Sequence, residues 1–236
     1  MRLFIGGYDV SGDINAFSGI NGGPAALEAT DITQFANAKM GGRRAGGAQF
    51  MAFFDDATDQ SHARLSALPT AQVTAMGLVG TAIGSASFNL PARQINYDGN
   101  RDQDGNLIFT VDLQSDGSGL EWGENLTAGR RVESAATNGT ALDGAASTAF
   151  GWQAYLQVFA LASGTPTIKL MDSADNATFA DLTGAGFGTI AARSTVRLQG
   201  GATATTRRYV RVSTTGTFTG LDFAVSFVRN LTATAF

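Results

Sequence analysis

The stretch Leu107-Ile108-Phe109-Thr110-Val111-Asp112-Leu113-Gln114 decides the fold class most clearly. Apolar side chains recur at every second position, and polar ones stand between them from Thr110 onward. Successive side chains of a β-strand point to opposite faces, so this alternation predicts a strand with one buried face. The dipeptide Asp104-Gly105 just before it favours a tight turn. The sequence therefore predicts a hairpin that leads into this strand.

The same two-residue period recurs along the rest of the chain. It is longest in residues 152–158 and 221–228, and shorter pieces fit at 50–54, 168–171 and 209–212. The 236 residues include 30 Gly and only 4 Pro, which is typical of many turns joined to short strands. We therefore predict a mainly β protein in which each apolar face packs on another sheet or on a helix.

One segment has the pattern of a helix. Residues 55–58 offer N-cap side chains, residues 59–68 follow them, and Pro69 marks the expected end. Leu65 and Leu68 are three residues apart, so both side chains would dock on a sheet.

Composition changes along the chain and predicts two domains. Residues 1–145 carry nine Lys or Arg and sixteen Asp or Glu, for a net charge of −7, whereas residues 146–236 have a net charge of +3. Residues 134–149 are small and polar, as in a linker or a long loop. We therefore predict a first domain at 1–145 with the helix and a C-terminal β-sandwich at 146–236. A second long loop is predicted at 36–47.

Few residues could carry catalysis or bind a metal ion. The chain has no Cys, and its single histidine, His62, follows Ser61 on the predicted helix, where adjacent side chains point in different directions. We expect His62 to be an exposed helix residue. The sequence thus predicts a protein that is not an enzyme and that has no cofactor and no metal site.

Two polar segments have an alternative interpretation as ion sites. Residues 98–105 resemble part of a calcium loop, but the twelfth position counted from Asn100 is Val111 rather than Glu. The hairpin turn explains these residues better. Residues 172–176 are predicted to form a second polar turn between strands.

Nucleic acid and membrane are not expected as binding partners. The acidic first half repels phosphates, and the Arg pairs at 43–44, 130–131 and 207–208 are isolated. The apolar run at the N-terminus is too short for a signal peptide, and the longest apolar stretch, residues 75–84, is too short to span a bilayer. We therefore expect synthesis in a cytosol.

The order of the segments resembles the major tail tube proteins of long-tailed, non-contractile bacteriophages. Residues 3–15 are similar to their opening strand, and residues 50–55 followed by 62–65 resemble their passage from strand to helix. Further similar segments are 94–99, Gly119-Leu120-Glu121-Trp122-Gly123, 155–158 and 172–176.

The resemblance implies a structural virion protein. It implies a β-sandwich or barrel-like tube domain with one short flanking helix, followed here by the C-terminal β-sandwich. Subunits of this family form rings, commonly hexameric, which stack into a hollow tube in the virion tail. The implied partners are further copies of the chain, other tail proteins (tape measure, terminator and distal tail proteins) and genomic DNA that passes without specific binding. Assembly would take place in the host cytoplasm.

Within that interpretation, the predicted loop at 36–47 is the candidate for contact between rings. Long loops often carry the contacts of a fold, and this one contains Met40, Arg43 and Arg44. We therefore predict these three residues as inter-ring contacts.

Two other functions stay open. The chain could be a phage fibre, baseplate or capsid-decoration protein whose β-sandwich binds a glycan, with Trp152 and Tyr155 as exposed stacking platforms. The alternation around Trp152 instead favours burial of this side chain. An enzyme that cleaves polysaccharide would need paired carboxylates, and no pair stands out.

Overall fold

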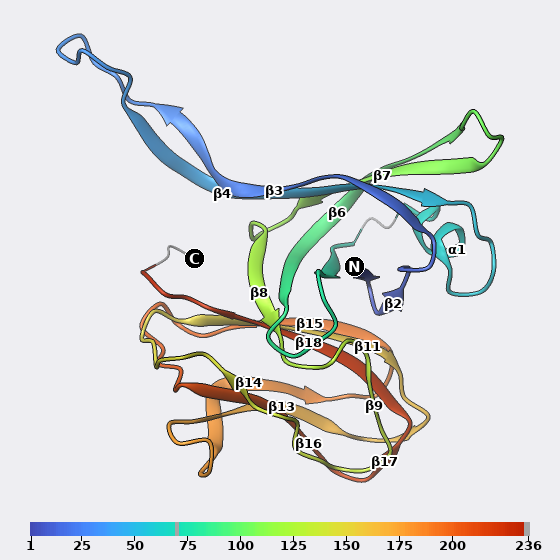
Figure 1. Ribbon diagram of the computed structural model, residues 1–236, viewed down its shortest axis with the longest axis vertical. Coiled ribbons are helices and arrows are strands. Elements are labelled where there is room, and N and C mark those ends of the chain that lie inside the picture. The colour runs from blue at the N-terminus through green and yellow to red at the C-terminus, as the bar shows by residue number, and fades with distance from the viewer. Residues whose placement is uncertain (69–70, 234–236) are drawn as a thin grey trace. The chain divides into compact units, whose positions relative to one another are not determined.

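The computed structural model describes residues 1–68 and 71–233, and it is mainly β, as predicted. Pro69, the predicted end of the helix, lies outside the described residues. The chain forms two compact units that are interleaved in sequence (Figure 1). Unit 1 comprises Met1–Gly12, Thr74–Asn89 and Trp122–Phe236, and unit 2 comprises Asp13–Val73 and Leu90–Glu121. The predicted domains, 1–145 and 146–236, instead follow one another along the chain, and that division stays a prediction.

Unit 2 is built on an antiparallel sheet with the strand order β3-β4-β7-β6. Its elements are β3 (Ile14–Glu28), β4 (Lys39–Phe53), α1 (Ser61–Leu65), β7 (Leu107–Ser115) and the second part of β6 (Ala86–Arg101). Phe50, Val111 and Leu113 are completely buried, which confirms the predicted face for the second half of β7, whereas Leu107 at its start is exposed. The predicted hairpin is also confirmed, because the amide of Gly105 donates to the carbonyl of Asp102 between β6 and β7.

Helix α1 is shorter than predicted, since it covers five residues instead of ten. The carboxylate of Asp13 accepts the amide of Ser61 at 2.8 Å, and the Ser61 hydroxyl donates to the carbonyl of Phe53. These two bonds and the buried side chain of Leu65 attach the helix to β3 and β4. Propensity alone could not have located this start, because the hydrogen-bond partner lies 48 residues earlier.

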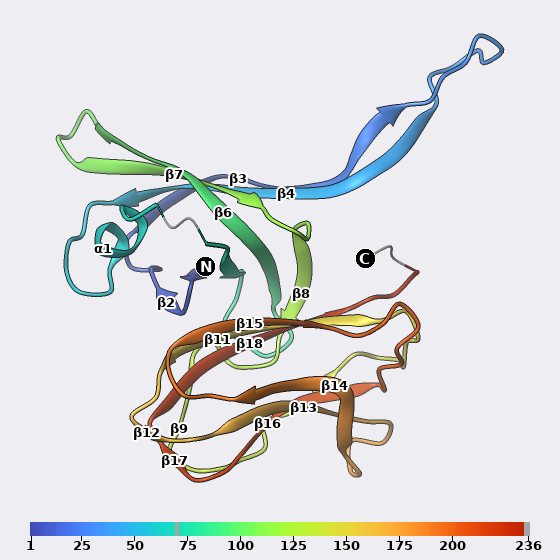
Figure 2. The same cartoon turned by 180° about the vertical axis from the view of Figure 1, so that it is seen from behind.

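Unit 1 contains a β-sandwich, and Figures 1 and 2 show its two sheets as stacked layers. One sheet has the order β15-β11-β18, with β8 and β9 paired to β18, and the other has the order β10-β16-β13-β14. The strands of the first sheet are β8 (Glu121–Asn125), β9 (Arg131–Glu133), β11 (Trp152–Ala160), β15 (Ser194–Gln199) and β18 (Leu221–Arg229). Those of the second are β10 (Leu142–Asp143), β13 (Thr167–Ser173), β14 (Ala180–Thr189) and β16 (Tyr209–Thr215). A two-stranded pair, β12 (Ser163–Gly164) with β17 (Phe218–Thr219), completes this region.

The space between the two sheets is filled by one apolar core. Alternate residues of β11 and β18 face β13, β14 and β16 there, as predicted for residues 152–158 and 221–228. The core contains Trp152, Leu156, Phe223, Phe227, Ile168, Leu170, Leu182, Phe187, Val210 and Val212.

The outer face of β11 and β18 is also buried, contrary to the expectation of a polar outer face. The strands β1 (Arg2–Ile5), β2 (Tyr8–Asp9) and β5 (Val73–Leu78) supply a second apolar cluster that includes Phe4, Met76 and Tyr155. Gln157 is completely buried and bonds the amide of Gly7 and the carbonyl of Thr74. Buried polar groups need such partners, so this side chain joins the N-terminal segment to the sandwich.

Residues 134–149 are not a free linker, which corrects the prediction. They run along the edge of β16: β10 pairs with it, and single bridges join Asn138 to Ser213 and Thr148 to Thr206. Small side chains suit this edge position because the segment is held through its backbone rather than by side-chain packing. The predicted turn at 172–176 is confirmed only in part, since Asp172 and Ser173 belong to β13.

Candidate assembly surface

The most exposed part of unit 2 is the outer half of the β3–β4 hairpin. Strand β4 pairs with β7 only from Gly47 onward, so residues 23–28 and 39–46 pair with each other alone. We call residues 23–46 the outer ribbon; it extends beyond its sheet as the blue hairpin in Figure 1. The predicted loop at 36–47 is therefore wrong from Lys39 onward, because these residues belong to β4. A two-stranded ribbon is marginally stable by itself.

The tip of the outer ribbon exposes large apolar side chains. Ile32 and Phe35 have relative exposures of 104% and 108%, so neither is shielded by the rest of the chain. The polar residues of the tip bond locally instead: the carboxylate of Asp31 accepts the amide and the hydroxyl of Thr33, which lowers the pKa of Asp31. Burial of an Ile or Phe side chain contributes about 1.5–3 kcal/mol, so this tip favours contact with another molecule.

The predicted contact residues lie on the same ribbon. Met40, Arg43 and Arg44 are all exposed on β4, and none of the described residues forms an ion pair with either arginine. Lys39 differs, because its ammonium group pairs with the Glu28 carboxylate across the hairpin at 2.6 Å. The structure places these three residues beside the apolar tip, and their role as contacts stays a prediction.

Leu120 holds the base of the outer ribbon. Gly22 and Gly46 are register partners, and the Leu120 side chain lies against both. A Cβ at Gly46 would lie 2.5 Å from the backbone nitrogen of Leu120, so only glycine fits there. Close packing at this point fixes the direction in which the ribbon leaves the sheet.

The opposite end of β4 leads to α1 and an aromatic cluster. His62 is half-buried rather than exposed, because its ring contacts Phe54, Tyr97 and Phe109. Its Nδ1 lies 3.1 Å from the Tyr97 hydroxyl. Burial, with the charge of Asp13 nearby, raises the pKa of Tyr97 to about 12. This histidine packs as a member of the aromatic cluster.

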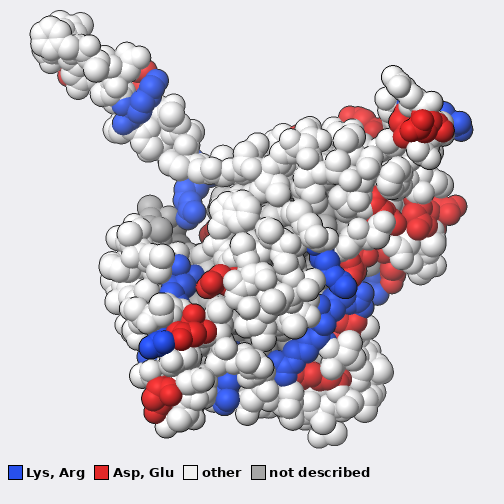
Figure 3. Space-filling view, in the orientation of Figure 1, with Lys and Arg blue, Asp and Glu red and all other residues white. Residues whose placement is uncertain are grey.

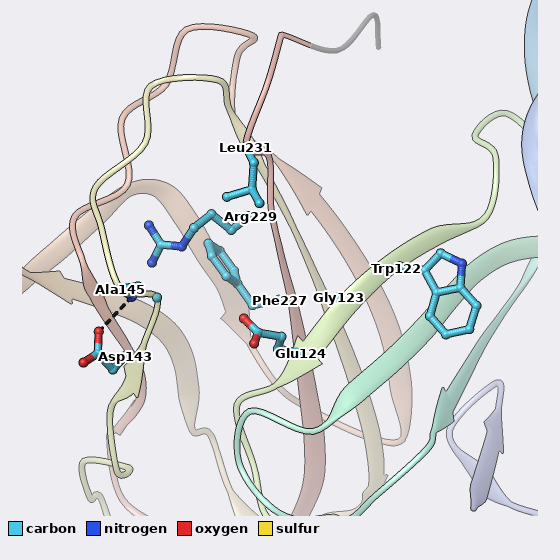
Figure 4. A pocket seen from close by; sticks show the side chains of 9 residues that line it. Trp122, Gly123, Glu124, Asp143, Ala145, Phe227, Arg229 and Leu231 are labelled. Atoms are coloured by element: carbon cyan, nitrogen blue, oxygen red, sulfur yellow. Dashed lines mark hydrogen bonds between the residues drawn. The ribbon is translucent and has the colours of Figure 1, made fainter.

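A pocket of about 410 Å³ opens on unit 1 at the end of β8 and β18 (Figure 4). It is lined by Trp122, Gly123, Glu124, Asp143, Gly144, Ala145, Phe227, Arg229 and Leu231. Trp122 is 54% exposed and shares a face of β8 with Glu124.

The charged groups of this pocket differ in how well they are paired. The Arg229 guanidinium points toward the segment of Ala145 in Figure 4 and donates to four backbone carbonyls, those of Ala146, Thr206, Arg207 and Arg208. Glu124 has no hydrogen-bond donor among the described residues, and partial burial raises its pKa while the charge of Arg229 opposes this.

Asp143, on the same rim of the pocket, is fully paired. Arg208 donates two hydrogen bonds to its carboxylate, and these bonds with the amide of Ala145 lower the pKa of Asp143 to about 2. Glu124 is thus the carboxylate of this pocket that stays free to accept a ligand hydroxyl.

Among the described residues, no three His, Cys, Asp or Glu side chains are grouped so as to hold a metal ion. No helix in the described part of the chain is both long and apolar enough to cross a membrane.

No protein-family model matches the chain, and no curated protein matches it. Solved structures do match at low similarity. The tail of an empty GTA particle with C6 symmetry has 14% identity and a TM-score of 0.35, over 46% of this chain and 81% of that one. The SPP1 Dit protein, titled a paradigm of the hub adsorption apparatus in phages that infect Gram-positive hosts, has 10% identity and a TM-score of 0.34, over 98% and 99%. The phage p2 baseplate in its activated conformation with Sr has 9% identity and a TM-score of 0.34, over 97% and 98%. A likeness at these TM-scores does not establish a shared function.

Sequence reasoning placed some of these residues correctly and missed others. Trp152 and Tyr155 are completely buried, so the preferred prediction of a core Trp152 is confirmed and the stacking platform at these two residues is excluded. Ile32, Phe35 and Trp122 were not singled out. The sequence did contain a signal for Ile32 and Phe35. They are the only large apolar residues in the segment 29–38, whose other residues are polar or small, and such a segment is not typical of a core strand.

Proposed function

We propose that this chain is a structural subunit of the tail of a long-tailed bacteriophage, with no catalytic role. In this proposal it is the major tail tube subunit, and copies form rings, hexameric by the resemblance of the sequence, that stack into the channel for DNA ejection. The single observation that carries the proposal is the outer ribbon, whose tip exposes Ile32 and Phe35 completely.

The outer edge of strand β3 supplies the second argument for assembly into rings. Among the described strands, β3 (15 residues) pairs with β4 alone, so its other edge presents backbone groups that no described strand pairs. A monomer with such an exposed strand edge tends to aggregate, whereas in an assembly of identical subunits the edge can form the interface with the next subunit. A ring that stacks needs two different complementary surfaces on each subunit.

The remaining partners follow from a place in the tail. The tube would meet tape measure, terminator and distal tail proteins, and DNA would pass through it. Unit 2 contains six basic and twelve acidic side chains, a net charge of −6. A channel lined by such a surface would repel phosphates, so that DNA slides without binding. The subunits would be made and assembled in the host cytoplasm.

Replacing the two apolar side chains of the tip is the direct test. We expect Ile32→Ser with Phe35→Ser to abolish tube formation in negative-stain images while the subunit stays soluble. Both side chains are fully exposed, so the thermal unfolding midpoint should change little. Val132→Ser is the matched control, since Val132 is 70% exposed on unit 1. Normal tubes from the double variant would refute the role of the tip.

A second candidate function is favoured by the pocket on unit 1. An exposed indole beside a carboxylate without a donor is an arrangement that suits a neutral sugar, whose CH face stacks on the ring while its hydroxyls donate to Glu124. In this case the chain would be a fibre, baseplate or capsid-decoration protein that recognises a host glycan.

A glycan array tests this alternative. We expect any specific binding to fall at least about fivefold in Trp122→Ala, because stacking on an aromatic ring contributes roughly 1 kcal/mol or more. Tube formation should be unaffected by this change. Unaltered glycan binding by Trp122→Ala would exclude the pocket as the binding site.

A further inference from the structure

Two surfaces of unit 2 complement each other in charge and in apolar character, and they lie at opposite ends of the same strand. We propose that the outer ribbon of one copy docks on the acidic end of unit 2 of a second copy. We define the acidic end as residues 54–65 and 96–106, with Phe53 and Leu107 beside them. The inference rests on the proposed function and names the surface that receives the ribbon.

The acidic end has a strong excess of negative charge. It carries six Asp and two Arg, a net charge of −4. Asp56, Asp98 and Asp104 are exposed, and no described residue forms an ion pair with any of them. Figure 3 shows acidic side chains gathered on the right, over the β6–β7 hairpin and the region of α1.

Apolar side chains are exposed among these charges. Phe53, Phe54 and Leu107 have relative exposures of 39%, 40% and 36%. Phe54 and Leu107 are neighbours on one face, because the amide of Phe54 donates to the carbonyl of Leu107 where β4 ends beside β7, whereas the side chain of Phe53 points to the other face. The aromatic cluster around His62 supports this patch from beneath, since the Phe54 ring lies 4.5 Å from the imidazole.

The outer ribbon has the matching features. Its exposed apolar side chains Ile32, Phe35 and Met40 would cover the patch of Phe54 and Leu107. Arg43 and Arg44, for which the described residues supply no acidic partner, would face the carboxylates of Asp56, Asp98 and Asp104. An interface of this kind combines an apolar centre with a charged rim.

One chain cannot make this contact with itself. Strand β4 begins in the outer ribbon at Lys39 and ends at Phe53, beside the acidic end, and 15 residues of strand extend about 50 Å. The two surfaces therefore pair only between copies. Because they differ from each other, the contact is heterologous, and it leaves a free ribbon and a free acidic end at the two ends of every stack. Such a contact continues from copy to copy, as a tube requires.

A charge exchange between two variants tests this pairing. The first variant reverses the ribbon (Arg43→Glu with Arg44→Glu). The second reverses the acidic end (Asp56→Lys with Asp98→Lys and Asp104→Lys), which changes its net charge from −4 to +2. All five side chains are exposed, so far-UV circular dichroism and the thermal midpoint should match those of the wild type.

We expect each variant alone to associate roughly tenfold or more weakly than the wild type in sedimentation velocity, because like charges then meet at the contact. An equal mixture should recover association. The acidic ribbon of the first variant then meets the basic end of the second, and the basic ribbon of the second meets the acidic end of the first. A mixture that stays as dissociated as its parts, or an acidic-end variant that assembles normally, would overturn the inference. Wild-type tubes alongside that result would leave the proposed function standing. Association of the mixture into species that never become tubes would keep the contact and remove the tail tube function.

Discussion

Replacing Trp152 by alanine is expected to lower the free energy of unfolding of unit 1 by about 3–5 kcal/mol, because it empties the centre of the sandwich. The indole is completely buried, stacks on Phe227 at a centroid distance of 6.2 Å and lies directly beneath Gly200. The surrounding strands pair on both sides of β11, so they cannot collapse into the cavity. Urea unfolding followed by circular dichroism measures the change.

The other tryptophan provides the matched control. Trp122 is 54% exposed, so Trp122→Ala should cost less than about 1 kcal/mol in the same measurement. Equal losses for the two variants would contradict the assignment of Trp152 to the core. The pair of variants therefore separates a tryptophan that stabilises the fold from one that is free to bind.

Gly46→Val is expected to have the second large effect, on assembly as well as on stability. Its Cβ would meet the backbone of Leu120 at 2.5 Å, and a backbone atom cannot move aside as a flexible side chain can. Overpacking of this kind costs about 1–3 kcal/mol. The base of the outer ribbon would have to shift, so the ribbon would leave the sheet in another direction and tubes would be lost.

Gly19→Val isolates this effect from the general consequence of adding a side chain to a strand. Gly19 lies on β3, and nothing lies within 4 Å of the Cβ that it would carry. Valine favours strands, so this variant should be as stable as the wild type and should form tubes. If Gly19→Val fails to assemble as Gly46→Val does, the close contact with Leu120 is not the reason.

The strands were predictable because their period is a local property. The alternation at 107–114, 152–158 and 221–228 indicates strands, and all three segments are strands. The apolar residues that it marks at 152–158 and 221–228 lie in the core of the sandwich, and Val111 and Leu113 are buried in unit 2. The β6–β7 turn was predictable for the same reason, since Gly105 supplies the positive φ of 86° that the turn needs. Neither prediction depends on residues far away in the chain.

The outer ribbon and α1 were not predictable in this way. Residues 39–46 are rich in Gly and Arg and have no apolar alternation, yet they form a strand because residues 23–28 pair with their backbone. Helix α1 begins at Ser61 because Asp13, far away in sequence, caps its first amide. In both cases the deciding partner is distant in sequence or is a backbone group, and no pattern of side chains records it.

By itself, then, the sequence determined a β protein and the apolar faces of its longest strands. The tertiary structure decided which strands are buried on both faces and which apolar side chains remain exposed. It also placed a basic ribbon and an acidic end at opposite ends of β4. The physical reason is that the alternation of apolar and polar residues shows only how the two faces of a strand differ. What covers each side depends on segments that the chain brings together from far apart, and exposure of Ile32 and Phe35 appears only when nothing arrives to cover them.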